Sequence, residues 1–306
     1  MVLVRPDNSV NGPANAGPSG ADSEFASAND TGPISIITDE PTCDAWNTIA
    51  GKSTDVEKSV NWADRDFKLP ASSWTPEQRA MFESMGKALT QAADQTVTLV
   101  TKTPHRAMRI LYGQYIAYTR AFVNRIPSYN GEEDDRLVSA FYGAGNGLTN
   151  ICAAITYRVA QAASPLVPVG SDPTSVAAPD DPNAPTKLLD EPTSICVDWK
   201  SLTSKFDQDT ESWRSIDKNI PAKDWTQEQK AVNDAVVPMM RANADEMERL
   251  GRQSGNPRLE DLATLGAQYR RAFAETVPDY KSADGYLVLS ASSVTRLINA
   301  ACKATT

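Results

Sequence analysis

The sequence is poor in the residues that build metal centres and nucleophilic catalytic sets. Its 306 residues include one histidine, His105, and four cysteines, none of which form a Cys-X-X-Cys pair. A structural zinc site needs about four such ligands at short spacing. A Ser/His/Asp or Cys/His set would have to use His105 and could therefore occur only once. We expect no metal, no cofactor and no catalytic residue.

Long apolar runs and an excess of positive charge are also missing. No stretch approaches the roughly 18 apolar residues of a membrane-spanning helix, and no secretory signal is visible. The formal net charge is −9, with 39 acidic against 30 basic residues. Such a charge disfavours nucleic acid and anionic lipid as partners. The opening "MVLVRPDNSVNG" is apolar and then polar, and we expect a membrane anchor upstream of it.

The alternation typical of strands is missing, whereas helical spacing is frequent. Thr75 is followed by Pro76 and Gln78, which is the pattern of a capping box with proline at the first helical position. Aromatic residues further along recur at steps of three and four, which predicts one buried helix face. Their positions are Tyr112, Tyr115, Tyr118 and Phe122. These patterns predict an all-α protein.

The sequence contains two copies of one pattern about 150 residues apart. "LPASSWTPEQR" at 69–79 corresponds to "IPAKDWTQEQK" at 220–230. All six tryptophans correspond in pairs: Trp46 with Trp199, Trp62 with Trp213, and Trp74 with Trp225. A long period with only two copies indicates a domain duplication. We expect two tandem, duplicated four-helix-bundle-like domains.

Composition divides the chain into four parts. Residues 1–37 are rich in Gly, Pro, Asn and Ser, and we expect a disordered tether there. The first helical repeat covers 38–160 and the second covers 188–306. Residues 161–187 hold six prolines, which predicts an extended linker between the repeats.

The cysteines lie at corresponding places in the two copies. Cys43 opens the first expected helix of copy one and Cys152 lies near the end of its fourth; Cys196 and Cys302 do the same in copy two. In an up-down-up-down bundle these two helix ends lie side by side. We therefore predict two intradomain disulfides, with four reduced core cysteines as the alternative. Disulfides would place the protein outside a reducing cytosol.

The phrase "DEPT" precedes the first cysteine of each copy. We interpret it as a domain boundary, at which Pro41 and Pro192 end the preceding irregular segment. Thr42 and Thr193 are then expected to cap the helix that follows.

One helix start carries unusual positive charge. His105, Arg106 and Arg109 fall in its first turns, with Tyr112 one turn further on. Cations there oppose the helix dipole, while free N–H groups favour an anion. These four residues are candidate ligands for an anionic group. The second copy, "NPRLEDLATL", adds two carboxylates, so we expect no such site there. The alternative is an exposed turn with acidic neighbours from another helix.

Two further motifs have structural and functional interpretations. "GEEDD" at 131–135 gathers four carboxylates, which suits acid–base chemistry or calcium, but we favour a solvated first helical turn. "YGAGNG" at 142–147 places three glycines in a helix. Close helix packing is favoured over a pocket lining.

The proline-rich tether, the acidic surface and the few, paired cysteines resemble extracytoplasmic domains of actinobacterial, mycobacterial-type envelope proteins. The resemblance is one of composition over the whole chain and transfers no residue role. It favours a non-catalytic binding, scaffold or sensor module of the cell envelope, membrane-tethered, with an envelope protein as partner. One alternative is a carrier of a small anionic or lipidic ligand between helices. Another is a carboxylate-dependent hydrolase.

Overall fold

The described part of the protein, residues 24–305 of a computed structural model, is helical and contains no strand. The first bundle consists of α1 (Cys43–Ser59), α2 (Pro76–Lys102), α3 (Arg106–Arg125) and α4 (Glu132–Thr156). The second bundle consists of α6 (Ile195–Asp209), α8 (Gln227–Gln253), α9 (Pro257–Thr276) and α10 (Gly285–Ala304). Two short helices, α5 (Val159–Ala163) and α7 (Glu211–Arg214), complete the set. The predicted all-α class is confirmed, and the repeated helix order agrees with a duplication.

Local sequence signals define where the long helices begin. The Thr75 hydroxyl accepts a hydrogen bond from the Gln78 N–H, and the Gln78 side chain accepts one from the Thr75 N–H. Thr226 and Gln229 form the same pair at the start of α8. Each box satisfies donors that a helix N-terminus leaves without intrahelical partners. Both predicted helix starts are therefore confirmed.

The central helix of each bundle is α3 or α9, and both are buried along most of their length. The aromatic stripe of α3 is fully enclosed, with Tyr112, Tyr118 and Phe122 at 0% exposure. The buried stripe of α9 includes Leu262, Leu265, Tyr269 and Phe273. Burial of each such side chain contributes about 1.5–3 kcal/mol of transfer free energy. Burial of apolar side chains on α3 and α9 thus stabilises the two bundles.

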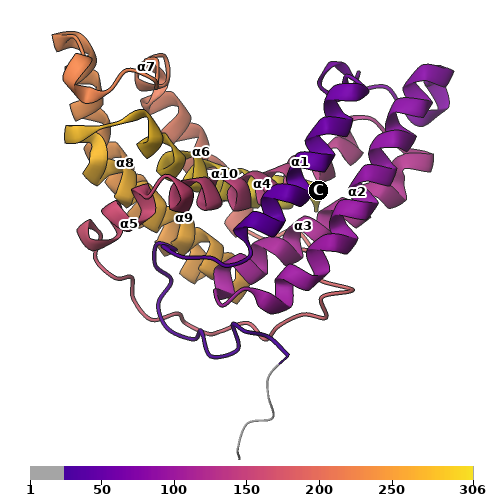
Figure 1. Cartoon of the computed structure of the whole chain (residues 1–306), viewed down its shortest axis with the longest axis horizontal. Coiled ribbons are helices and arrows are strands. Elements are labelled where there is room, and N and C mark those ends of the chain that lie inside the picture. Colours follow the sequence, from indigo (N-terminus) through magenta and orange to yellow (C-terminus); the bar gives the residue numbers. More distant parts are fainter. Residues whose placement is uncertain (1–23, 306) are drawn as a thin grey trace, which may run out of the picture.

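Helices α4 and α10 pack against one another and join the bundles. They run antiparallel, because Arg136 near the start of α4 donates to the Lys303 carbonyl, while Tyr157, just past its end, stacks on Tyr286. A Cβ on Gly143 would lie 2.7 Å from the backbone of Leu297, so only glycine allows this approach. The favoured interpretation of "YGAGNG" as a close-packing motif is correct here. In Figure 1 the two bundles diverge from this seam like the arms of a V.

Two irregular segments cross the base of the V, on the side away from its opening (Figure 1). The sequence predicted disorder over 1–37. Residues 1–23 lie outside the described residues, but in 24–37 the side chains of Ile34, Ile36 and Ile37 are buried. These isoleucines have apolar surface to bury against the bundles, which the composition of the segment as a whole conceals.

The proline-rich connection is extended, as predicted, but it is attached to the bundles along its length. Its predicted start was wrong, because residues 161–166 belong to α5 and a 3-10 turn, and residues 167–190 contain no helix. The Thr174 N–H and hydroxyl donate to Glu260 of α9 at 2.9 and 3.0 Å, and Gln114 of α3 donates to the Thr186 carbonyl. The two bundles are therefore parts of one body and not separate beads.

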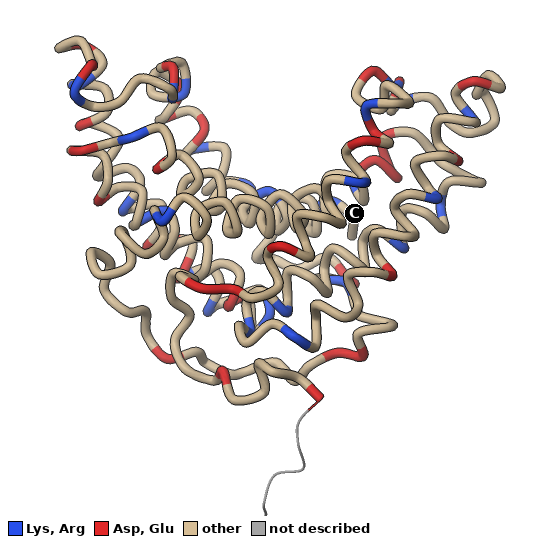
Figure 2. The backbone as a smooth tube through the Cα atoms, viewed as in Figure 1, with Lys and Arg blue, Asp and Glu red and all other residues tan. Residues whose placement is uncertain are grey.

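Charge is mixed over the described surface. Figure 2 shows acidic and basic residues interspersed along both arms. Among the helices of residues 24–305, none has the length and apolar character needed to cross a membrane.

Candidate functional site

The four residues predicted to bind an anion lie together at the base of the molecule. His105 directly precedes α3 and is half-buried, while Arg106, Arg109 and Tyr112 follow in its first two turns and are buried. Their hydrogen-bond partners, described next, come from this chain.

Arg106 joins the two bundles. Its side chain is 0% exposed, and its Nε and Nη2 donate to the two carboxylate oxygens of Asp261 at 2.8 and 3.0 Å. Asp261 lies on α9, so this bidentate pair connects the central helices of both bundles. The remaining guanidinium donors reach the backbone carbonyls of Asp30 and Gly32. All the charge-assisted bonds of this buried cation are made within the protein.

The free N-terminus of α3 also binds a carboxylate of this chain. The Arg106 backbone N–H donates to Asp30 Oδ2 at 2.6 Å. An anion at a helix N-terminus is favoured by unpaired N–H groups and by the helix dipole. The physical reason for predicting an anion was therefore sound, but the anions present are Asp30 and Asp261. We interpret Arg106 as a structural lock.

Burial acts on both charges of this pair. Desolvation raises the pKa of Asp261 above its ordinary value, even though Arg106 lies beside it. Desolvation also acts to lower the pKa of Arg106, but the hydrogen bond and charge of Asp261 and the charge of Asp30 raise it overall. A pair this deep is costly to break, because either partner alone would be a buried, uncompensated charge.

The other two basic residues bind the segment that precedes α1. Arg109 Nη1 donates to the Ser27 hydroxyl at 2.8 Å, and its guanidinium lies 5.9 Å from the centroid of the Phe25 ring. His105 Nε2 lies 2.7 Å from the Asp39 carbonyl oxygen. In the tautomer with its proton on Nε2, the ring donates a hydrogen bond to that oxygen. These contacts hold residues 25–39 against α3.

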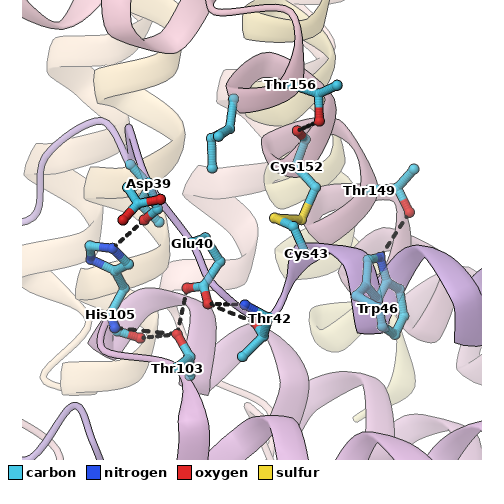
Figure 3. Close-up of a disulfide and its surroundings, with 12 residues drawn as sticks. Asp39, Glu40, Thr42, Cys43, Trp46, Thr103, His105, Thr149, Cys152 and Thr156 are labelled. Atoms are coloured by element: carbon cyan, nitrogen blue, oxygen red, sulfur yellow. Dashed lines mark hydrogen bonds between the residues drawn. A yellow bond between two sulfur atoms is a disulfide. The ribbon is translucent and has the colours of Figure 1, made fainter.

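Tyr112 belongs to a buried network around Glu40. Figure 3 shows the bonds of Glu40 to Thr42 and Thr103. The Glu40 carboxylate accepts hydrogen bonds from the Thr42 N–H and hydroxyl at 3.0 and 2.7 Å, and from the Thr103 hydroxyl at 2.6 Å. Tyr112 Oη lies 2.8 Å from the Thr42 hydroxyl. Burial raises the pKa of Tyr112. Thr42 was expected to cap α1, but its hydroxyl is used here and forms no cap.

This network is specific to the first copy. Glu191, the counterpart of Glu40 in the second "DEPT", is exposed. The residue before α6 is Ser194, not the predicted cap Thr193. Sequence analysis missed Glu40 because it considered only the proline, threonine and cysteine of the phrase.

Both predicted disulfides are present. Cys43 is bonded to Cys152 and Cys196 to Cys302, and Figure 3 shows the first of them at the start of α1. Each joins the first and last long helix of its bundle, as the topology predicted. Two such bonds indicate an oxidising, extracytoplasmic environment.

The carboxylates of "GEEDD" are paired with cations rather than gathered around an empty centre. Asp134 accepts from Arg125 Nε at 2.7 Å, and Asp135 accepts from Arg65 Nη2 at 2.6 Å. Glu132 lies 3.4 Å from Lys68 Nζ. Within residues 24–305, no cluster of His, Cys, Asp and Glu has the arrangement of a metal site. The motif forms the first turn of α4, as favoured, but that turn is only partly solvated, because Asp134 is buried while Glu132 and Glu133 are exposed.

Open apolar concavities occur in the second bundle, and sequence analysis did not anticipate them. A groove of about 740 Å³ lies between α6 and α8, with Leu202, Phe206 and Met239 among its lining residues. A smaller cavity of about 370 Å³ lies among Trp213, Trp225 and other residues of the second bundle. In the first bundle, aromatic rings fill the end around Phe82. An open pocket of about 440 Å³ lies beside α1 and α4, with Tyr115 of α3 and Gly145 of α4 among its lining residues, and it is the place where the carrier alternative would hold a ligand.

Comparison with known proteins gives the chain a family. The model for the family described as "Mycobacterial ESX-1 associated protein" matches residues 25–306. An uncharacterized protein of Mycolicibacterium smegmatis (strain MKD8) is 40% identical over 294 residues, which cover 95% of this chain and 78% of that protein. No solved structure matches the chain. The mycobacterial character expected from composition is confirmed, and the chain belongs to the mycobacterial ESX-1 associated protein family.

Proposed function

We propose that this protein is a non-catalytic binding or scaffold module that acts outside the cytoplasm and binds protein partners of the ESX-1 secretion system. The family match supports the association with that system. The two disulfides support the compartment. The membrane tether expected upstream of residue 1 is part of this proposal.

One observation carries the binding role. The α4–α10 seam and the Arg106–Asp261 pair fix the two bundles as one body, and that body leaves an apolar groove open between α6 and α8. A preorganised surface loses little conformational entropy on binding, which favours affinity. The chain is thus built to present a surface of fixed shape.

The groove has the character of a protein-binding surface. Phe206, Leu202 and Met239 contribute apolar area, and Met239 is 37% exposed. Lys205 and Asp198 are among the charged residues that also line it. An apolar centre with a charged rim is typical of protein interfaces, where a few buried apolar anchors supply most of the binding energy.

Photocrosslinking tests the proposal. A benzophenone-bearing amino acid at position 239 should form crosslinks to an ESX-1 protein in mycobacterial cells that contain the system. The matched control is the same residue at Ala88, the counterpart of Met239 in α2. Met239→Glu should weaken the interaction at least tenfold, because it places a charge in the apolar groove. Equal crosslinking from both positions, or none from 239, would contradict the proposal.

A further inference from the structure

The upper end of the first bundle, far from the base, is filled by a cluster of aromatic rings. Phe82 of α2 is central to it: its ring stacks on Trp74 with centroids 4.0 Å apart and meets the edge of Trp62 at 4.9 Å. Tyr129 lies 5.0 Å away on another side. Phe82 is 1% exposed, and Trp62 and Trp74 are 2% and 9% exposed. A ring in this position therefore closes the end of the bundle.

The second bundle keeps the ring walls but lacks the central ring. Trp213 and Trp225 correspond to Trp62 and Trp74, whereas Asn233 stands where copy one has Phe82. A second ring is also lost, because Ser292 of α10 stands in the place of Tyr142. The result is the cavity of about 370 Å³, which is lined by these four residues of the second bundle together with others. Both tryptophans that line it are half-buried.

Hydrogen bonds hold the walls of this cavity in place. Trp213 Nε1 donates to Asn233 Oδ1 at 3.1 Å, and Asn233 Nδ2 donates to the Gln229 carbonyl at 2.9 Å. Trp225 Nε1 donates to the Ile220 carbonyl at 2.9 Å. Asn233 thus replaces an aromatic ring with an amide that orients one wall. The two indole rings are fixed without a third ring between them.

We propose that this cavity takes up one aromatic side chain of a protein partner, in the place that Phe82 occupies in the first bundle. The proposal rests on the function proposed above and identifies a second contact with the partner. In copy one the ring that fills this space is itself a protein side chain. Stacked and edge-on ring pairs attract one another beyond the effect of their area burial.

The position of the cavity suits an anchor residue of a larger partner. Arg214, Asp217 and Lys218 line it as well and are exposed to solvent. Aromatic residues that insert into preformed pockets, with charged residues around them, are frequent energetic centres of protein interfaces. The cavity lies in the same arm as the α6–α8 groove, near α7 (Figure 1).

The test is a titration of the full chain with N-acetyl-phenylalaninamide, followed by the NMR signals of the indole N–H groups. We expect saturable shifts of the Trp213 and Trp225 signals with a dissociation constant in the millimolar range, which corresponds to about 4 kcal/mol. N-acetyl-alaninamide should cause none. Absence of saturable shifts with the aromatic probe would overturn the proposal.

Filling the cavity supplies the matched variants. Asn233→Phe restores the ring of copy one and should weaken probe binding at least tenfold. Ala235→Phe adds the same ring to an exposed position of α8 and should leave binding unchanged. Ser292→Tyr fills the cavity from α10 and replaces Asn233→Phe in the test if that variant folds poorly. The signals of the other indole N–H groups show whether each variant is folded. Undiminished binding in both filled variants would overturn the proposal.

One comparison distinguishes a protein side chain from a small aromatic molecule as the ligand of the cavity. Another distinguishes failure of this inference from failure of the proposed function. Binding of free benzyl alcohol without binding of N-acetyl-phenylalaninamide would overturn the side-chain assignment in favour of a small molecule. Crosslinking from position 239 that persists while no probe binds would remove this inference and leave the proposed function standing. Probe binding without any crosslinked protein would contradict the protein partner in both the proposed function and this inference.

Discussion

At the scale of single residues, two buried polar clusters occur once and are not duplicated. Arg106 and Asp261 form one across the bundles, and Glu40 with its threonines forms the other. Each satisfies buried polar groups that would otherwise carry a desolvation cost. They give two sharp predictions, because each has a control in the same chain.

The Arg106–Asp261 pair should behave as a unit. Asp261→Asn leaves the Arg106 guanidinium buried with reduced compensation, and we expect a loss of about 3–5 kcal/mol in the free energy of unfolding. The double variant Arg106→Met, Asp261→Leu removes both charges and should recover most of that loss. Urea unfolding followed by circular dichroism measures both. A double variant as unstable as the single one would disprove this coupling.

Glu40 should contribute to the stability of the protein, whereas its counterpart Glu191 should not. Glu40→Gln replaces an acceptor-only carboxylate with an amide whose NH₂ faces N–H and hydroxyl donors. We expect a loss of about 1–3 kcal/mol, the usual cost of an unsatisfied buried group. Glu191→Gln, on the exposed copy, should change stability by less than about 0.5 kcal/mol. Equal effects in thermal unfolding would argue against the network.

At the scale of helices, the seam depends on close approach of α4 and α10. A Cβ on Gly143 would lie 2.7 Å from the backbone of Leu297 in α10, whereas a Cβ on Gly51 of α1 would meet nothing within 4 Å. The same substitution should therefore have opposite effects at the two sites. The comparison isolates packing from helix propensity.

Gly143→Ala should destabilise the protein by about 1–3 kcal/mol, because the added methyl group forces α10 away. Gly51→Ala should stabilise it by about 0.5–1 kcal/mol through helix propensity alone. Denaturant midpoints at constant slope give both values. Stabilisation by Gly143→Ala would mean that the helices have room to separate.

The helices themselves could be predicted from sequence because their signals are local. Thr75 and Gln78 are three residues apart, and the stripe from Tyr112 to Phe122 needs only one helix to be seen. The partner of Arg106 could not be predicted, because Asp261 is 155 residues away and meets it only after the bundles dock. The cavity was in principle visible: aligning Phe82 with Asn233 shows the missing ring.

At the scale of the whole molecule, the disulfides and the seam act together. Each disulfide spans more than 100 residues, with separations of 109 and 106. Loop closure of this length reduces the entropy of the unfolded chain, by about 4–5 kcal/mol in the simplest model. Because the seam joins the two bundles, a loss of stability in one bundle also destabilises the other.

Removing either disulfide should therefore lower the stability of the whole body in one transition. We expect Cys43→Ser with Cys152→Ser, and separately Cys196→Ser with Cys302→Ser, to cost about 2–5 kcal/mol each. Non-reducing mass spectrometry of the parent should find both bonds. Two separate unfolding transitions, or an unchanged midpoint, would contradict the picture of one cooperative body.

The charge difference between the copies also determines which bundles can meet. In the alignment of the two copies, Asp261 corresponds to Ile110 and Arg106 to Pro257. Two first bundles placed face to face would set each buried Arg106 against isoleucine, and two second bundles would set Asp261 against proline. Like bundles from different molecules would thus bury Arg106 without Asp261, or Asp261 without Arg106, at a cost of several kcal/mol. The connection over 167–190 keeps the matching bundle at a high effective concentration. The two bundles of one chain are consequently expected to dock on one another, and exchange of bundles between molecules is disfavoured.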